Sequence, residues 1–253
     1  MLEVHVLASG SDGNCTVIES DGEAIMVDAG LSCRKIMSLM ELAGVDKDMV
    51  KAILVTHEHT DHVVGVGATA RKLGVPVYAT QGTFGASSMG NVDFHPVDKS
   101  SGFSIGGMDI TPLPTSHDAA DPCCYYTRTG SGNVLFATDT GKLNFQIEHA
   151  ITEADVAVLE SNYDPQMLAD GPYPVSLKRR IRSDLGHLSN FDCAKAVKDL
   201  LRPDAQLFLA HLSKTNNTPD TARQTVADNS GLSRHKVDCM EFPGDVRTIK
   251  ARV

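Results

Sequence analysis

The pattern of apolar and polar positions divides the first part of the chain into short runs and one longer periodic stretch. Three apolar runs, Val4–Ala8, Cys15–Glu19 and Ala24–Val27, are separated by the turn-forming residues Gly, Asp and Asn. This pattern predicts three successive strands. Residues 33–43 then carry apolar side chains at helical spacing and are followed by Gly44, which predicts a helix that ends at this glycine.

The same alternation continues along the rest of the chain. Further strands are predicted at Ala52–Val55, Val75–Ala79, 109–113, 123–128, 133–137, 155–159, 205–210 and 236–241. Helices are predicted at Val63–Leu73, 143–151, 174–183, 190–201 and 219–229. Because strands gather in each half with helices between and after them, we expect two sheets packed face to face and covered by helices, a four-layer α/β arrangement.

Two features of the loops complete this organisation. The stretch Thr111–Pro122 contains three prolines and a histidine, and we expect it to be an active-site loop. No Pro/Ser-rich linker or low-complexity tract divides the chain. We therefore expect residues 1–253 to form one domain.

Composition narrows the class of protein. Hydrophobic residues make up 42% and charged residues 22% of the 253 positions, which is typical of a soluble enzyme and excludes disordered, collagenous and coiled-coil classes. The formal charge of −9 disfavours wholesale electrostatic wrapping of nucleic acid but permits a small local cationic site. Trp is absent and aromatic residues make up only 5%, which argues against an aromatic platform for stacked bases.

The N-terminal sequence and the cysteines indicate in which cellular compartment the protein works. The chain starts MLEVHVLASG, which lacks the basic and apolar regions of a signal peptide. No window approaches 18 uninterrupted apolar residues, so no membrane span or membrane partner is expected. None of the six cysteines forms a C-x-x-C pair. We expect reduced cysteines in a cytoplasmic protein.

Candidate chemistry is concentrated directly after the predicted strand Ala52–Val55. The run contains His57, His59, Asp61 and His62 within six residues. In extended backbone the first three would point to one side, with His62 following as the chain turns into the next helix. Imidazole and carboxylate groups at this spacing favour Zn, Mn or Fe, whereas a lone histidine is more often an ordinary surface or core residue.

This run closely resembles the signature of the metallo-β-lactamase superfamily, and other residues extend the resemblance in the expected order. Asp28 follows a predicted strand, as does the early aspartate of the family. His117 matches the third motif, Asp139 the bridging aspartate of the fourth, and His211 the terminal histidine. The resemblance implies the αββα sandwich of that superfamily.

The resemblance also implies a dinuclear metal centre. One divalent ion would be bound by His57, His59, His117 and Asp139, and the other by Asp61, His62, Asp139 and His211. Asp28 would orient a ligand histidine. A hydroxide bridging the two ions would be the nucleophile, and Asp61 would orient it as well as binding metal.

Four further segments resemble the YycJ (WalJ) branch of this superfamily. They are Ser9–Asn14, Glu160–Asp164, Gly186–Asn190 and His211–Asn217. The branch resemblance implies a metal-dependent nuclease that acts as an exonuclease at DNA 5′ ends. Longer ribonuclease relatives carry an inserted domain, for which the 47 positions from Glu160 to Leu207 leave no room.

Three groups of residues carry finer expectations, each beside a plainer interpretation. His187 is our candidate for protonating the leaving oxygen; alternatively it caps the helix near Asn190 or faces solvent. Ser9, Ser11 and Asn14 would contact a terminal phosphate, or form an ordinary glycine-rich turn. The cationic run at positions 178–182 is typical of a solvated helix face; alternatively it guides a phosphate backbone to the site.

Two other functions remain open at the level of sequence. The acidic charge and the scarcity of aromatic residues favour a hydrolase of the same fold that acts on a small cyclic phosphodiester, thioester or lactone. A di-iron electron-transfer protein or a binding module without activity is the third interpretation. The complete set of seven ligands argues against the last.

Overall fold

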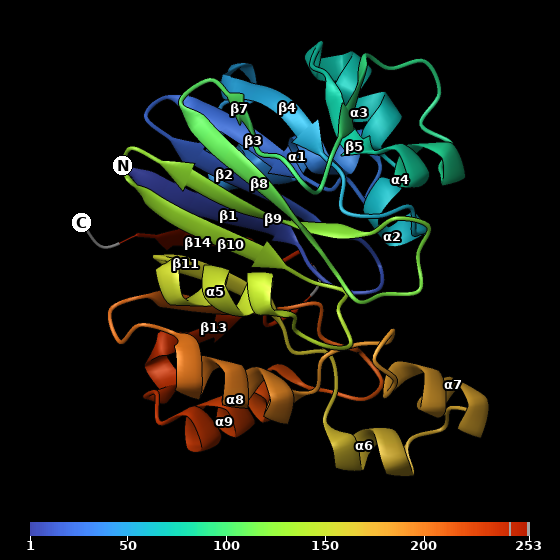
Figure 1. Ribbon diagram of the computed structural model, residues 1–253, viewed down its shortest axis with the longest axis vertical. Helices are drawn as coiled ribbons and strands as arrows, with labels where there is room; N and C mark the ends of the chain where they lie inside the picture. Colours follow the sequence, from blue (N-terminus) through green and yellow to red (C-terminus); the bar gives the residue numbers. More distant parts are fainter. Residues whose placement is uncertain (243, 252–253) are drawn as a thin grey trace.

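The computed structural model describes residues 1–242 and 244–251, and its strands form two sheets (Figure 1). The first sheet has the order β14 (Arg247–Lys250), β1 (Leu2–Ala8), β2 (Cys15–Ser20), β3 (Glu23–Val27), β4 (Val50–Leu54), β5 (Val77–Thr80), β6 (Phe94–Val97). The second has the order β13 (Val237–Cys239), β12 (Gln206–Ala210), β11 (Val156–Glu160), β10 (Gly132–Ala137), β9 (Cys123–Thr129), β8 (Met108–Pro114), β7 (Phe103–Ile105).

Helices cover the outer face of each sheet. They are α1 (Cys33–Ala43), α2 (Thr60–Val63), α3 (Val66–Leu73), α4 (Gln81–Ala86), α5 (Phe145–Glu153), α6 (Pro165–Asp170), α7 (Val175–Ile181), α8 (Asn190–Leu200) and α9 (Pro219–Ser230), with short 3₁₀ turns at Lys47–Met49 and Arg234–Lys236. In Figure 1, α6 and α7 lie apart from α8 and α9, beside the loops at the strand ends.

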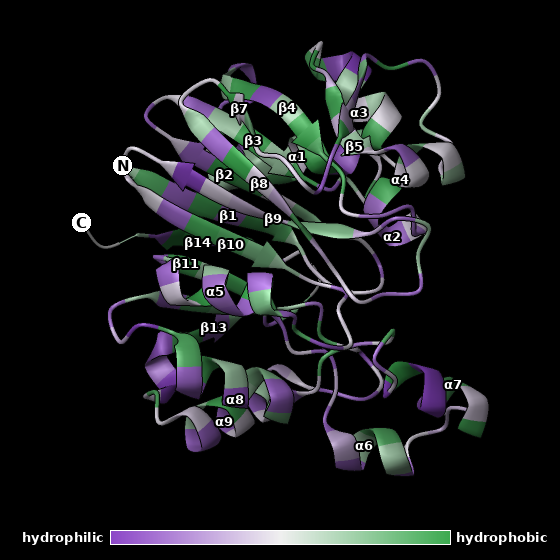
Figure 2. Ribbon diagram, viewed as in Figure 1, coloured by the Kyte–Doolittle hydropathy of each residue, from purple (hydrophilic) through white to green (hydrophobic). Residues whose placement is uncertain are grey.

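Three apolar clusters make this a four-layer sandwich. Residues such as Val4 and Phe136, which come from different sheets, are buried between the two sheets. Ile36 on α1 packs on the outer face of the first sheet, and Ile147 on α5 packs on the outer face of the second. Figure 2 shows the corresponding alternation of apolar and polar colour along the helices. The predicted sandwich is therefore confirmed.

Parallel pairing gathers the ends of strands that are distant along the chain. In the first sheet β3, β4, β5 and β6 run parallel, and in the second β10, β11, β12 and β13 do so. The carboxyl ends of parallel strands meet at one edge of a sheet, where α/β proteins place their binding sites. Asp28, Asp139, Glu160 and His211 each end such a strand or directly follow one.

Local sequence accounts for many of the element boundaries. Helix α1 begins after Ser32, whose side chain accepts a hydrogen bond from the Lys35 amide, and ends at Gly44 in the left-handed conformation, as predicted. The helix predicted at Val63–Leu73 is instead divided into α2 and α3. The division falls at Gly65, where a Cβ atom would lie 1.8 Å from the Leu31 carbonyl oxygen.

Some sequence predictions were wrong in extent. The first four residues of the expected loop Thr111–Pro122 belong to β8, so the loop comprises residues 115–122. Strands β6, β7 and β14 and helices α4 and α6 were not predicted. Pro96 lies within β6, which is an edge strand; edge strands tolerate the missing amide donor of proline. Among the described residues, no helix is long and apolar enough to cross a bilayer.

Candidate metal centre

Three side chains of the site project from strained positions at strand ends. Asp28, Asp139 and His211 have φ angles of 59°, 54° and 55°, in the left-handed region that side-chain-bearing residues rarely adopt. Each lies one or two residues after a buried strand in the parallel part of its sheet. Strain of this kind persists where the surrounding structure holds it, and it is concentrated at functional sites.

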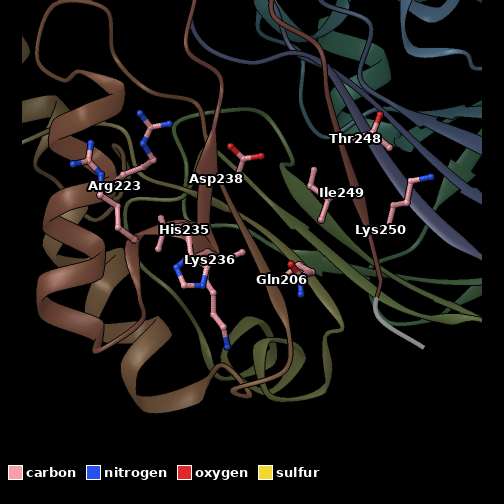
Figure 3. Close-up of a pocket in the computed structure, with 11 residues that line it drawn as sticks. Gln206, Arg223, His235, Lys236, Asp238, Thr248, Ile249 and Lys250 are labelled. Atoms are coloured by element: carbon pink, nitrogen blue, oxygen red, sulfur yellow. The ribbon is translucent and has the colours of Figure 1, made fainter.

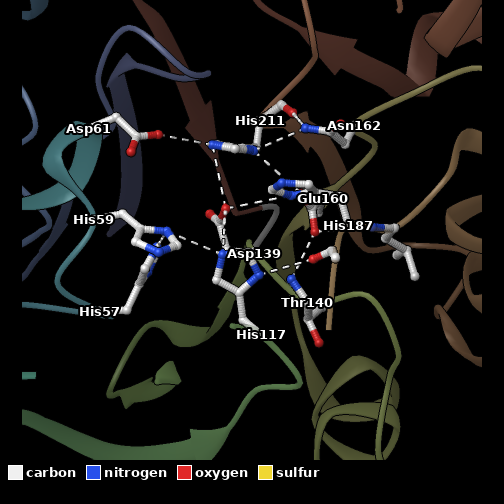
Figure 4. A network of polar contacts seen from close by, with 12 residues as sticks. His57, His59, Asp61, His117, Asp139, Thr140, Glu160, Asn162, His187 and His211 are labelled. Carbon is white, nitrogen blue, oxygen red and sulfur yellow. Dashed lines mark hydrogen bonds and ion pairs between the residues drawn. The ribbon is translucent and has the colours of Figure 1, made fainter. Parts of the chain in front are cut away.

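Three histidines form the first half of the site (Figure 4). His57 Nε2 lies 3.0 Å from His59 Nδ1, and His117 Nε2 lies 3.4 Å from the same atom. His57 and His59 come from the loop after β4, and His117 comes from the loop after β8. Their ligand atoms all lie within 4.8 Å of one another. The structure thus brings together the three histidines that the family resemblance grouped at one ion.

Asp61, His62 and His211 form the second half. His211 Nε2 lies 3.4 Å from Asp61 Oδ2, and His62 Nε2 lies 3.5 Å from the same oxygen. The predicted reason for this convergence was wrong in part. Asp61 lies on the short helix α2 rather than in extended backbone, so helical geometry, and not strand alternation, turns it toward the site.

Asp139 lies between the two halves. Its Oδ2 atom is 3.2 Å from His62 Nε2, and its Oδ1 atom lies 3.6 to 3.7 Å from the Nε2 atoms of His211 and His117. Although the side chain is buried, Oδ2 has no hydrogen-bond partner among the described residues. Its contact with His62 is an ion pair without hydrogen-bond geometry. A buried carboxylate oxygen that accepts no hydrogen bond is costly, so this atom points to a cation that the site is built to hold.

The ring nitrogens that face away from the centre are held by a second set of contacts. His62 Nδ1 lies 2.7 Å from Asp28 Oδ2, and His117 Nδ1 lies 3.0 Å from the Gly186 carbonyl oxygen. Asp28 also accepts hydrogen bonds from the amide and hydroxyl of Thr56. Such contacts fix the orientation of a ligating imidazole. The contact is the one that the predicted role of Asp28 requires, and the role itself stays a prediction.

The buried charges act differently on the individual side chains of the site. Burial and the neighbouring His62 hold the pKa of His57 well below its ordinary value, so this imidazole is neutral. Burial alone would raise the pKa of Asp139, but His211 and His62 lower it well below its ordinary value. Burial alone would lower the pKa of His62, but Asp28 and Asp139 outweigh this effect and raise the pKa to about 10. A bound cation would displace that proton.

The donor set fits divalent metal. Imidazole nitrogens and carboxylate oxygens converge from both halves, and the described residues contribute no cysteine to these groups. Zn, Mn and Fe accept such nitrogen and oxygen donors. His57, His59, His117, Asp61, His62, Asp139 and His211 would hold the metal.

His187 lies beside this centre and pairs with a residue that the sequence prediction did not single out. Its Nδ1 atom is 2.7 Å from Oε1 of Glu160, which is fully buried at the end of β11. The other carboxylate oxygen of Glu160 accepts hydrogen bonds from the amides of Thr140 and Leu188. The helix near Asn190 is capped by Ser189, so His187 is not its cap. The signal for Glu160 was its position at the carboxyl end of a buried strand, close to where Asp28 and Asp139 stand relative to their own strands.

Two residues of the loop after β1 contact histidines of the metal centre. Ser9 Oγ accepts a hydrogen bond from the His211 amide at 2.7 Å. Asn14 Oδ1 accepts one from the Gly10 amide, and its Nδ2 lies 3.0 Å from His62 Nε2. Ser11 is exposed. Two of the three residues expected to contact phosphate are thus already engaged in contacts within the protein, while Ser11 faces solvent.

Comparison with known proteins identifies the family. Residues 8–198 match the metallo-beta-lactamase superfamily. The chain belongs to the metallo-beta-lactamase superfamily. Within it, a relative from Bacillus anthracis named exodeoxyribonuclease YycJ is 40% identical over 235 residues, which cover 89% of this chain and 88% of the relative. One from Streptococcus pneumoniae named exodeoxyribonuclease WalJ is 38% identical over 231 residues, covering 88% and 86%. The resemblance to this branch of the superfamily is confirmed.

Solved structures of the superfamily agree on the fold. The metallo-beta-lactamase fold protein YhfI from Bacillus subtilis superposes with a TM-score of 0.71 at 18% sequence identity, covering 98% of this chain and 99% of that protein. At that identity the likeness concerns the fold alone.

A second polar region lies away from the superfamily motifs (Figure 3). This cleft of about 690 Å³ is lined by residues of β13, β14, α9 and the turn before β13. Arg223, Arg234, Lys236 and Lys250 give it a cationic lining. None of the residues proposed as metal ligands borders it.

Proposed function

We propose that this chain is a metal-dependent hydrolase that cleaves phosphodiester bonds in DNA, acting as an exonuclease at 5′ ends. The observation that carries the proposal is the convergence of seven His and Asp side chains, among them Asp139, whose buried Oδ2 atom accepts no hydrogen bond from the described residues. The relatives at 38 to 40% identity, whose names specify exodeoxyribonuclease activity, support DNA as the substrate.

We propose two divalent ions, of Zn, Mn or Fe. His57, His59 and His117 would hold one, and the second half of the site would hold the other. Asp139 would bind both, because its two oxygens face both halves. When bound, the ions supply a Lewis acid for the phosphate and lower the pKa of a water molecule to near neutrality. The carboxylate of Asp61, 24% exposed at the centre, would orient the attacking water.

His187 would deliver the proton that the leaving oxygen needs. Its imidazole is held by Glu160 through Nδ1, and its side chain is 18% exposed, so the ring remains accessible from the site. Burial alone would lower the pKa of His187, but the Glu160 carboxylate outweighs this effect and raises it. A histidine that keeps its proton near neutral pH is suited to general-acid catalysis.

Other parts of the proposal concern phosphate contacts and location. Ser11 is the residue of the loop after β1 that remains exposed for a terminal phosphate; Ser9 and Asn14 would shape the loop around it. The six cysteines are all unpaired, which supports the proposal of a reducing, cytoplasmic location.

The test is a substrate panel with protein loaded with Mn or Zn. The panel contains DNA with a 5′-phosphate, RNA of the same sequence, bis-p-nitrophenyl phosphate and a lactone. We expect release of mononucleotides from the DNA. Cleavage confined to the small esters would support the alternative of a small-molecule hydrolase. Absence of turnover at full metal occupancy, measured by elemental analysis, would contradict both.

A further inference from the structure

The cationic residues at positions 178–182, on α7 and directly after it, make two kinds of contact. Lys178 Nζ donates a hydrogen bond to the Ala169 carbonyl oxygen at 2.7 Å, and Arg182 donates one to the Pro165 carbonyl oxygen at 3.0 Å. These two cations, four residues apart, lie on one face and tie α7 to α6. They are structural contacts, so the run as a whole is not a uniform path for phosphates.

Arg180 points to the other side, toward the metal centre. Its Nε atom donates a hydrogen bond to Asp118 Oδ2. The second oxygen of Asp118 lies 3.6 Å from His117 Nε2, the ring nitrogen that faces His59. One carboxylate therefore separates the guanidinium of Arg180 from a proposed metal ligand.

The same end of α7 is packed against His187. The His187 amide donates to the Ile181 carbonyl oxygen at 3.0 Å. A Cβ atom on Gly186 would lie 2.3 Å from the Arg180 carbonyl oxygen, which shows how closely the backbones approach. Arg180 and the proposed proton donor thus lie on the same side of the centre.

The ion pair of Arg180 and Asp118 is exposed to solvent, whereas the neighbouring His117 of the metal centre is buried. The side chain of Arg180 is 51% exposed and that of Asp118 is 32% exposed, whereas His117 is almost wholly buried. An exposed ion pair of this kind contributes little to stability. A planar guanidinium is, however, the group that best matches two phosphate oxygens.

We propose that Arg180 binds the substrate phosphate next to the scissile one, on the side of the leaving group, and that Asp118 positions its guanidinium. This inference rests on the proposed function. In the reaction the attacking water oxygen bonds to phosphorus and releases a proton to solvent, while the bond from phosphorus to the 3′ oxygen breaks. That oxygen takes a proton from His187, which regains one from solvent. When the first nucleotide is removed, the next phosphate on this side is the terminal 5′-phosphate. Arg180 therefore distinguishes a 5′-phosphate end from a 5′-hydroxyl end.

The experiment compares Arg180→Gln with Arg179→Gln. Each variant removes one positive charge from α7, and Arg179 is exposed and makes no hydrogen bond or ion pair with the described part of the chain. The substrates are one oligodeoxynucleotide with either a 5′-phosphate or a 5′-hydroxyl. Wild type and Arg179→Gln should prefer the phosphorylated end. In Arg180→Gln, KM for that end should rise about tenfold or more, as expected for a lost charge-assisted contact, with kcat nearly unchanged.

Three further measurements separate binding from folding. Arg180→Lys should recover part of the preference, because it restores the charge without the planar fork. Asp118→Asn should raise KM for the phosphorylated end by a smaller factor. Hydrolysis of bis-p-nitrophenyl phosphate and the melting temperature should match wild type in Arg180→Gln.

The outcomes distinguish failure of this inference from failure of the proposed function. An active wild type with no preference between the two ends, or an Arg180→Gln variant that keeps the preference, overturns the inference alone. Equal losses in Arg179→Gln and Arg180→Gln would show a general field of charge and also overturn it. A wild type that cuts neither oligonucleotide overturns the proposed function, and the inference with it.

Discussion

The metal centre and the cleft between β13 and β14 are both lined by charged and polar side chains, but they satisfy those side chains in opposite ways. In the cleft, Arg234 pairs with Asp220, Lys250 pairs with Glu3, and Lys236 donates to the Pro203 carbonyl oxygen. In the centre, acidic and imidazole groups are aimed at one another, and the buried Oδ2 of Asp139 accepts no hydrogen bond from the described part of the chain.

The difference shows that volume and charge are weak guides to function. The cleft has a volume of about 690 Å³, yet Arg234 and Lys250 already pair with carboxylates and Lys236 with a backbone carbonyl, and surface ion pairs of this kind contribute little. The centre is nearly closed and its polar groups are incompletely satisfied without a cation. Incomplete satisfaction of buried polar groups persists where function requires it, so the centre, and not the cleft, should respond strongly to substitution.

The largest effect is expected from Asp139→Asn. Loss of the carboxylate that lies between both halves should reduce turnover on DNA by about a thousandfold or more, because several kcal/mol of metal-derived stabilisation would be lost. Elemental analysis should show fewer ions bound per chain. The matched control is Asp238→Asn in the cleft, which should retain wild-type turnover. Equal activity of the two variants would remove the distinction between the regions.

A smaller loss is expected from His187→Ala. Turnover should fall by about 10² to 10⁴, the usual contribution of a general acid, while metal content stays at the wild-type level. The control His235→Ala, in the cleft, should have no effect. Loss of metal together with turnover would instead make His187 a ligand.

The pH dependence of kcat in Glu160→Gln tests the role of His187 as proton donor in a second way. Because Glu160 raises the pKa of His187, the proton donor is present below that pKa and is lost as pH rises through it. Removing the negative charge should lower the pKa of His187, so the falling limb of kcat against pH should move to lower pH. A limb that does not move would separate Glu160 from the proton donor.

An intermediate effect on the metal is expected from Asp28→Asn. The His62 ring would lose its charged partner at 2.7 Å, and outer contacts of this type typically account for ten- to a hundredfold in metal affinity, or about 1.4 to 2.8 kcal/mol. Titration with Zn or Mn would measure the change. Asp93→Asn, at an exposed surface carboxylate, is the control and should bind metal as wild type does.

The smallest effect is expected from the double variant Arg234→Gln and Lys236→Gln in the cleft. Turnover on DNA should be unchanged, and the free energy of unfolding should change by about 0.5 kcal/mol or less, as is usual for exposed positions. Denaturant titration and the DNA assay would measure both. A large rise in KM for DNA would show that the cleft, too, binds substrate.

Individual residues show which parts of the site the sequence predicted and which it did not. The strand periodicity placed His57 correctly, because apolar runs before a polar cluster mark a strand end. It misplaced Asp61, since a four-residue helix leaves no periodic signal. The pairing of Glu160 with His187 was not predicted, because it joins segments 27 residues apart with no local pattern linking them. The sequence also did not predict that Lys178 and Arg182 contact α6 while Arg180 contacts Asp118, because no local pattern links these segments.

The amino-acid order by itself determined the layered fold and the cluster of polar residues after the strand at 52–55, because these depend on periodicity and residue type within short windows. The full set of seven candidate ligands came from the resemblance to the superfamily motifs. Only the tertiary structure decided which imidazole nitrogens face which carboxylate oxygens, and that Asp28 contacts His62. It also decided that Arg180, and not its neighbours on α7, contacts Asp118 beside the metal centre. These contacts depend on how two sheets pack and where distant loops meet, and no local pattern encodes them.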